Sequence, residues 1–187
     1  RPADIKGINT GYNKLHIIIQ RIEKEKHMNI RTATIKDLEA VTAVEAECFP
    51  QAEAATKEEL AERLKYYADH FWLMFDGDKL IAFVDGFVTD EKDLTDEMYA
   101  KADLHNPNGA WQMIFGVNTI PSYRRHGYAG ELIKCAIEDA KAQGRKGLVL
   151  TCKDHLVHYY AKFGFVNEGV SGSEHGGVVW NQMRLEF

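Results

Sequence analysis

A loop with two glycines and two arginines is the segment of this sequence best suited to bind a phosphate-bearing ligand. It follows a predicted strand and Pro121, and a helix begins within it. Glycines at 127 and 130 let the backbone approach a ligand closely, and the unpaired N–H groups at a helix start favour an anion. The strand–loop–helix setting disfavours the alternative of a basic turn without a ligand. The loop consists of Arg124, Arg125, His126, Gly127, Tyr128, Ala129 and Gly130.

The hydrophobic pattern around this loop predicts an α/β fold with a mixed sheet. Its elements are expected in the order strand, two helices, three strands, helix, strand, helix and two strands. Thr34 and Asp37 resemble a capping box at the start of the first helix, and Thr56 and Glu59 form one at the start of the second. Strands are expected at 29–32, 71–75, 80–88, 110–119 and 148–152, from 165, and at the C-terminal end, with the later helices at 127–143 and 154–163.

Composition limits the class of protein further. The chain has 187 residues, a length typical of one domain or one domain with a short appendage. Its net charge of −5 disfavours general nucleic-acid binding, and its longest aliphatic run, 17–19, is too short to cross a bilayer. Residues 1–27 are interpreted as an N-terminal extension or leader of unknown role. Three cysteines without C-x-x-C spacing predict reduced thiols in the cytoplasm: Cys48, Cys135 and Cys152.

Several stretches resemble one enzyme superfamily. Arg124-x-x-Gly127-x-Ala129 resembles the Q/R-x-x-G-x-G/A loop of the GNAT acetyltransferases, whose backbone amides hold the pyrophosphate of acetyl-CoA. Residues 151–165 are similar to the C-E-D-A-L-V-P-F-Y-x-x-F-G-F stretch of the arylalkylamine (serotonin) N-acetyltransferase branch. The resemblance implies a GNAT domain over 28–187: a mostly antiparallel central sheet flanked by helices, with two parallel strands that splay apart. Further similar segments are 80–86, 93–95, 105–109 and, toward the bacterial members, 171–180.

The resemblance also implies roles for individual residues. The reaction would be transfer of an acetyl group from acetyl-CoA to a primary amine by direct attack. The backbone of Val117, Asn118 and Thr119 would pair with the pantetheine arm, and the loop from Arg124 to Gly130 would bind the pyrophosphate. Tyr160 matches the catalytic tyrosine of the branch, which donates a proton to the departing CoA thiolate. From the pattern alone, Tyr160 reads more simply as a packed aromatic residue.

The base that deprotonates the amine is left open. Animal members of the branch use two histidines on the strand before the loop, where this sequence has Met113 and Phe115. The substitutes considered are Glu53, His158, His175 and a chain of water molecules.

The acceptor pocket is predicted to be apolar. Met113, Phe115 and Val117 face one side of their strand by its period of two, and Phe49 and Pro50 lie in the loop after the first helix. Such a wall favours an amine with an aromatic body and one reactive nitrogen. An acidic segment argues for a polyamine instead if it lies at the pocket mouth: Asp90, Glu91, Asp93, Asp96 and Glu97.

We therefore predict a GNAT N-acetyltransferase that uses acetyl-CoA as cosubstrate and an arylalkylamine-like small molecule as acceptor. The alternatives are the same fold acting on a polyamine, an aminoglycoside or a protein N-terminus, and a non-catalytic acyl-CoA-binding module. No metal is expected, because His155 and His158 have no clear partners at ligand spacing. No nucleic-acid or membrane partner is expected, and a homodimer is left open.

Overall fold

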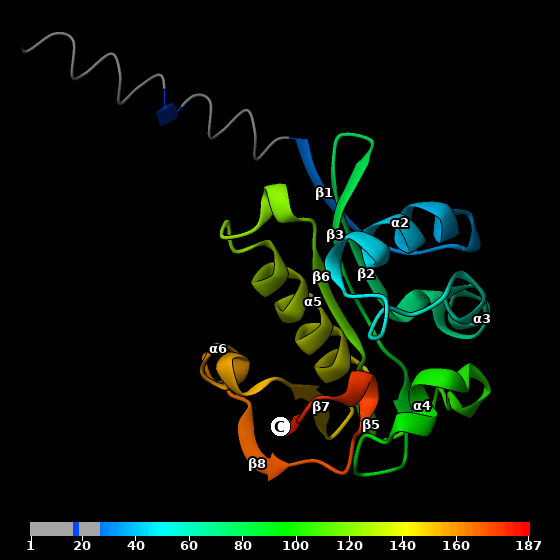
Figure 1. Cartoon of the computed structure of the whole chain (residues 1–187), viewed down its shortest axis with the longest axis vertical. Coiled ribbons are helices and arrows are strands. Elements are labelled where there is room, and N and C mark those ends of the chain that lie inside the picture. The colour runs from blue at the N-terminus through cyan, green and yellow to red at the C-terminus, as the bar shows by residue number, and fades with distance from the viewer. Residues whose placement is uncertain (1–16, 19–26) are drawn as a thin grey trace, which may run out of the picture.

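The computed structural model describes residues 17–18 and 27–187 (Figure 1). The predicted extension, 1–27, therefore lies almost wholly outside the described residues. The described part contains a four-stranded sheet in the order β1-β2-β3-β6 and a five-stranded sheet in the order β4-β5-β7-β9-β8.

Helices and strands alternate much as the hydrophobic pattern predicts. The strands are β1 Met28–Thr32, β2 Phe71–Asp76, β3 Lys79–Asp85, β4 Val88–Thr89, β5 Trp111–Ile114, β6 Gly116–Thr119, β7 Gly147–Cys152, β8 Val166–Val170 and β9 Asn181–Glu186. The helices are α2 Leu38–Cys48, α3 Lys57–Tyr67, α4 Asp96–Ala100, α5 Tyr128–Ala142 and α6 Val157–Ala161. Short 3-10 turns precede or follow several of these helices.

Both predicted capping boxes are confirmed. Thr34 and Asp37 satisfy each other's backbone N–H groups at the turn that leads into α2, and Thr56 and Glu59 do the same at α3. These bonds satisfy N–H groups that would otherwise have no partner in the first turn. The helices α2 and α3, which flank the loop 49–56, therefore each begin at a fixed residue.

The four-stranded sheet is antiparallel throughout and lies between two layers of helix. Figure 1 shows α5 on one side of this sheet and α2 and α3 on the other. Apolar residues of α5 and of the strands are buried together in one cluster. Buried positions spaced three and four residues apart give α5 its inward face: Leu132, Ile133, Ala136, Ile137 and Ala140.

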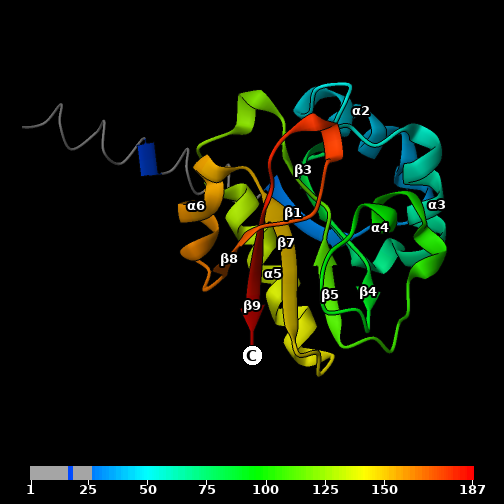
Figure 2. The ribbon, with the colours of Figure 1, turned by 60° about the horizontal axis from the view of Figure 1, so that its bottom comes forward.

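The five-stranded sheet contains the predicted pair of parallel strands. Strand β5 pairs with β7 in parallel from Trp111–Gly147 to Ile114–Leu150, and every other pairing in this sheet is antiparallel. Figure 2 shows β7 between β5 and β9, with α6 and β8 beyond β9. After Ile114 the chain leaves β7 and continues as β6 in the other sheet, so the two parallel neighbours separate.

Two predicted strands are each divided between the two sheets, which the pattern did not indicate. The strand expected over 80–88 ends at Asp85, and β4 then pairs with β5. Gly86 permits this crossing, because a Cβ there would lie only 1.8 Å from the carbonyl oxygen of Met113. The strand expected over 110–119 is interrupted at Phe115, whose N–H donates to the Asp85 carbonyl oxygen at 2.8 Å.

Candidate active site

The gap between β6 and β7 is the centre of the candidate site. Strand β6 pairs with β3 on one side, and in the described part of the chain it is the last strand of its sheet. Its other edge therefore carries backbone N–H and C=O groups that a ligand can pair with. Val117 and Thr119 are half-buried along this edge, whereas Asn118 is buried.

The glycine-containing loop has the backbone geometry of an anion site. Gly127 caps α5 in a left-handed conformation with φ +85°, and no side chain caps the helix there. A Cβ at Gly127 would meet nothing within 4 Å, so the glycine serves the backbone conformation and leaves the space outside open. Arg125 also has a positive φ of 64°, which is uncommon for a residue with a side chain. The first N–H groups of α5 have no partner within the helix and point outward, as anion binding requires.

Two neighbouring cavities extend from this gap. The loop cavity, of about 420 Å³, reaches Arg124, Ala129 and Thr119. The acidic cavity, of about 350 Å³, lies deeper and is lined by three carboxylates, Glu45, Glu53 and Glu59, together with Arg63. Six residues line both cavities: Phe49, Glu53, Val117, Leu156, Tyr160 and Trp180.

Tyr160 lies where the two cavities meet. Its ring packs edge-on against Tyr159 and Phe165, at centroid distances of 5.2 and 6.2 Å, and only 6% of the residue is exposed. Burial is the main cause that raises the pKa of Tyr160 well above its ordinary value, so the phenol stays protonated at neutral pH. The same apolar surroundings raise the pKa of the nearby Cys152 thiol to about 11.

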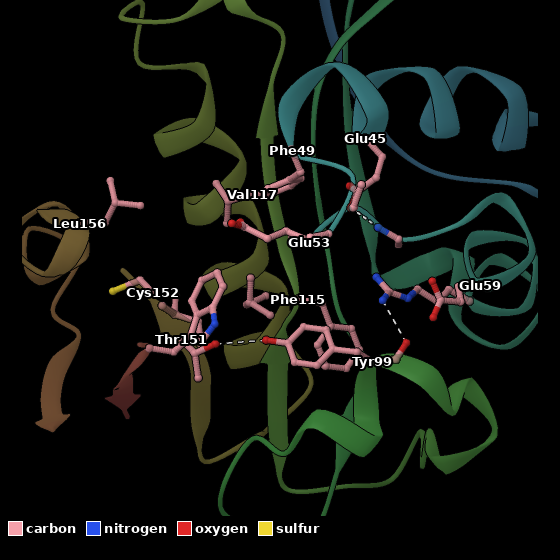
Figure 3. A pocket seen from close by; sticks show the side chains of 18 of the residues that line it. Glu45, Phe49, Glu53, Glu59, Tyr99, Phe115, Val117, Thr151, Cys152 and Leu156 are labelled. Atoms are coloured by element: carbon pink, nitrogen blue, oxygen red, sulfur yellow. Dashed lines mark hydrogen bonds between the residues drawn. The ribbon is translucent and has the colours of Figure 1, made fainter. Parts of the chain in front are cut away.

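The carboxylates of the acidic cavity come from one side of it. Figure 3 shows Glu45 and Glu59 on the α2–α3 side and Thr151, Cys152 and Leu156 opposite, with the Glu53 side chain reaching across the middle. Glu53 accepts a hydrogen bond from Lys153 Nζ at 2.8 Å, which ties the loop after α2 to the end of β7. Glu59 belongs to the capping box of α3, where its Oε2 accepts from the Thr56 N–H at 2.7 Å.

Arg63 enters the same cavity with its charge already paired. Its Nη1 donates to Asp85 Oδ2 at 3.0 Å, its Nη2 donates to the Tyr99 carbonyl oxygen at 3.0 Å, and both charged side chains are buried. The guanidinium also lies 5.2 Å from the centroid of the Phe115 ring. The ion pair between Arg63 and Asp85 joins α3 to β3.

Aromatic and apolar side chains form the rest of the acidic cavity. Tyr99 Oη and Thr151 Oγ1 share a hydrogen bond of 3.1 Å across its wall (Figure 3). Lys153 Nζ lies 5.7 Å from the Trp180 ring centroid. The remaining apolar surface comes from Phe49, Ile114, Phe115, Val117, Leu150 and Leu156.

Most of the predicted acceptor residues lie at these cavities. Phe49, Glu53 and Phe115 line the acidic cavity, and Pro50 lines the loop cavity. Met113 does not face either cavity. It is fully buried on β5, because the crossing at Phe115 interrupts the period-of-two pattern from which its position was predicted.

The histidines considered as bases are placed differently. His158 is exposed on α6 and lines neither cavity. The side chain of His175 lies outside the described part of the structure. Within the loop, Arg124 and Ala129 reach the loop cavity, while Arg125, His126 and Gly127 are exposed on the outer surface. The remaining loop residues are Tyr128, half-buried beside His126, and Gly130, buried at the start of α5.

The acidic segment 90–97 does not reach the acceptor side. None of its acidic residues lines the acidic cavity or the loop cavity. Asp93 pairs with Arg184, and Asp96 accepts hydrogen bonds from Ser173 Oγ and the Glu174 N–H. Asp90 binds Asn106 and the Ala110 N–H. These carboxylates join the segment to its neighbours, so the segment does not supply negative charge at the mouth of the acceptor pocket.

Sequence reasoning missed several residues that line the acidic cavity, among them Glu45, Glu59, Arg63, Tyr99 and Trp180. For Glu45 a signal was available. By helical spacing it shares the inward face of α2 with Val41, Val44 and Cys48. A glutamate at an inward position is rarely buried without a partner, so its presence there indicates a specific role.

Two further properties concern the described residues alone. Among them, no group of three or more histidine, cysteine, aspartate or glutamate side chains is arranged to hold a metal ion. No helix in the same part of the chain has the length and apolar character needed to traverse a bilayer.

Comparison with known proteins adds a family to this geometry. The family model described as acetyltransferase (GNAT) family matches residues 38–165. The loading GNATL domain of CurA from Lyngbya majuscula superposes with a TM-score of 0.73 and 15% identity, over 85% of this chain and 97% of that domain. The PaiA N-acetyltransferase of Thermoplasma acidophilum, solved with coenzyme A, gives 0.63 and 18%, over 86% and 99%.

A GNAT-family acetyltransferase from Streptococcus pneumoniae gives a TM-score of 0.63 and 24% identity, over 86% of this chain and 99% of that one. At these identities the three structures support the shared fold and do not identify a substrate.

Proposed function

The chain belongs to the GNAT acetyltransferase family, and from that premise we propose that it acetylates the primary amine of an arylalkylamine-like small molecule. Acetyl-CoA is the acetyl donor, and the amine attacks it directly. One observation carries the proposal: Tyr160 lies at the junction of a cavity that reaches the phosphate loop and a second cavity lined by carboxylates and aromatic rings. A donor and an acceptor entering from the two cavities would meet beside it.

The loop cavity has the groups that a CoA molecule needs. The open edge of β6 at Val117–Thr119 offers backbone groups to the amide-containing pantetheine arm. The first N–H groups of α5, which have no partner within the helix, and the loop from Arg125 to Gly130 suit a pyrophosphate. Arg124 is held beside this path because its Nε donates to the Thr119 carbonyl oxygen at 2.9 Å. When bound, acetyl-CoA supplies the activated thioester.

Tyr160 is the proposed proton donor to the departing thiolate. In water a phenol with a pKa of about 10 and a thiol with one of about 8.5 differ by about 1.5 units, an uphill transfer of roughly 2 kcal/mol. Burial raises the pKa of Tyr160, but it also raises the pKa of the Cys152 thiol in the same surroundings to about 11. A CoA thiol released there is desolvated in the same way, so burial raises the pKa of the thiol as well as that of the phenol.

The acidic cavity suits an amine with one charged group and an aromatic body. Arg63 and Asp85 offset each other, and so do Lys153 and Glu53. Glu45 and Glu59 then leave a negative balance that attracts an ammonium group, while Phe115 and other rings offer contact area to an apolar body. A second ammonium on the acceptor would have to be desolvated beside these rings and the Arg63 guanidinium, at a cost in free energy.

The test is a comparison of amines at one pH and ionic strength, with release of the CoA thiol as the readout. We expect higher kcat/KM for phenethylamine and tryptamine than for spermidine. A clear preference for spermidine would overturn the aromatic acceptor and leave the acetyltransferase activity standing. The panel also includes an aminoglycoside and a peptide with a free N-terminus. Binding of acetyl-CoA without transfer to any amine would favour a non-catalytic acyl-CoA-binding module.

A cytoplasmic location is proposed on the chemistry of the thiols. Cys48, Cys135 and Cys152 are all free, as expected for a protein kept in a reducing compartment. The partner proposed for this protein is a small-molecule amine, and the net charge of −5 gives no support to a nucleic acid.

A further inference from the structure

Glu45 is a buried carboxylate at the inner wall of the acidic cavity. Only 5% of the residue is exposed, and it lines that cavity. Its Oε1 accepts a hydrogen bond from the Ala55 N–H at 2.9 Å, and its Oε2 accepts one from Asn118 Nδ2 at 2.6 Å. The carboxylate is therefore held between the loop 49–56 and β6, the strand along the gap. Each oxygen still has a lone pair that can take a proton.

An amine acceptor creates a need for such a group. A primary amine with a pKa near that of lysine, about 10.4, enters as an ammonium ion at neutral pH and must lose a proton before it can attack. Of the carboxylates in the cavity, Glu53 is already paired with the Lys153 ammonium, at 2.8 Å. Glu59 is engaged in the cap of α3. Glu45 differs from Glu53 because its two hydrogen bonds come from neutral amides, and from Glu59 because it is buried and takes no part in a helix cap.

We propose that Glu45 is the general base that takes the proton from the acceptor ammonium, a role that rests on the proposed acetyltransferase function. The N–H bond breaks and its proton passes to a carboxylate oxygen of Glu45. The freed lone pair on nitrogen forms the bond to the thioester carbonyl carbon. The C–S bond then breaks with its electron pair on sulfur, which takes the proton of Tyr160. The amide nitrogen gives up its second proton to solvent, Tyr160 regains one, and Glu45 releases its proton, so the cycle closes.

The surroundings of Glu45 adjust it to this task. Burial, first, and the negative charge of Asp85 on β3 raise the pKa of the Glu45 carboxyl. The Ala55 N–H and the Asn118 amide oppose that rise, as does the positive charge of Arg63 on α3. A base is most effective when its pKa lies near the working pH, and a raised pKa moves a carboxyl in that direction.

The local structure also allows a substitution at Glu45 that keeps its hydrogen bonds. Asn118 Oδ1 is buried and has no hydrogen-bond partner, while Nδ2 of the same amide donates to Glu45. In Glu45→Gln, rotation of the Asn118 amide by 180° would present Oδ1 to the new amide group, and the glutamine oxygen would still accept from Ala55. The matched control is Glu47→Gln, the same change two residues further along α2 at an exposed position.

The experiment measures kcat/KM against pH for the wild type, Glu45→Gln, Glu47→Gln and Glu53→Gln with two acceptors. One acceptor is phenethylamine. The other is 2,2-difluoro-2-phenylethylamine, whose fluorines lower the pKa of its ammonium group, so that more of it is free amine. At pH 7 we expect Glu45→Gln to lose about 10²–10⁴-fold in kcat/KM with phenethylamine, the typical contribution of a general base. Glu47→Gln should match the wild type, and the Kd for acetyl-CoA should be unchanged.

The fluorinated amine and the pH profile separate catalysis from structure. Without a base, Glu45→Gln can use only free amine, so its kcat/KM should rise with pH in proportion to the free-amine fraction. Its defect should also shrink by about tenfold or more with the fluorinated acceptor. An equal defect with both amines at every pH, or no defect at all, would overturn the proposal. The proposal would also be overturned if the fluorinated amine restored activity in Glu53→Gln alone, because Glu53 would then be the base.

The two proposals fail differently. Turnover by the wild type together with full activity of Glu45→Gln removes the role of Glu45 and leaves the acetyltransferase function intact. A wild-type protein that binds acetyl-CoA and acetylates no amine overturns both.

Discussion

Replacing Tyr160 by phenylalanine removes one hydroxyl group at the junction of the two cavities. The ring contacts with Tyr159 and Phe165 do not involve that hydroxyl, so the packing of α6 should survive. We therefore expect a folded protein whose acetyl-CoA affinity is nearly unchanged and whose chemical step is slowed.

The size of the effect follows from the burial of Tyr160, of which only 6% is exposed. A hydrogen bond to a charged group contributes about 1.5–3 kcal/mol, so losing the bond to the thiolate slows the step by about 10- to 10²-fold. Losing proton transfer as well brings the loss to the range typical of general acid catalysis, about 10²–10⁴-fold. Because Tyr160 is buried, we expect solvent to replace the phenol poorly, which favours the upper part of that range.

The assay is single-turnover acetylation of phenethylamine by enzyme preloaded with acetyl-CoA, which isolates chemistry from product release. Calorimetry gives the Kd for CoA in parallel. Tyr66→Phe on the exposed surface of α3 is the control, and it should turn over like the wild type. A single-turnover rate for Tyr160→Phe within about threefold of the wild type, against the expected range, would refute the role of proton donor.

Three further outcomes follow from the structure. Gly127→Glu should weaken CoA binding in calorimetry, because it adds a negative charge and a side chain at a position with φ +85° that faces open space; unchanged affinity would remove the loop from the site. Arg63→Met should lower the free energy of unfolding by about 3–5 kcal/mol in a denaturant titration, because it leaves the Asp85 charge buried alone, and adding Asp85→Leu should restore part of the loss. Arg31 holds the pKa of Asp37 below its usual value, so the ion pair adds to the free energy of unfolding. This contribution is fully present above the unfolded pKa of about 3.9 and is lost as pH falls through the lower folded pKa. Asp37→Asn should therefore make the free energy of unfolding less dependent on pH in the acid range.

The sequence by itself determined the elements and the donor side of the site. The capping boxes at Thr34 and Thr56 fix where two helices begin, because the bonds that satisfy the first N–H groups are made within four residues. The position of Gly127 at the start of α5 was equally local, since strand, loop and helix follow one another directly. The expected strand at 148–152 became β7, and the helical spacing of Leu60, Leu64 and Tyr67 coincides with the inward face of α3, where all three are buried.

Periodicity was less reliable at the ends of elements. The helical spacing would place Ile35 on the inner face of the first helix, and the period of two would place Val179 and Phe187 on one face of the last strand beside Met183. Met183 is buried, but the other three are exposed by 56%, 65% and 45%. Residue 35 lies in a 3-10 turn, and residues 179 and 187 lie outside β9, so the period of the neighbouring element does not extend to them.

Only the tertiary structure decided the acceptor side. Two predicted strands cross from one sheet to the other. As a result Met113 lies in the core, while Phe115 and Val117 lie at the cavity. No local sequence pattern encodes which sheet a strand joins. The acidic cavity gathers Glu45 from α2, Arg63 from α3 and Tyr99 from the segment after β4, residues separated by tens of positions. Their charges and burial depend on partners such as Asp85 and Asn118, which the fold brings beside them. Chemistry that needs several side chains at one point is decided by topology, because sequence spacing constrains distances only within a single element.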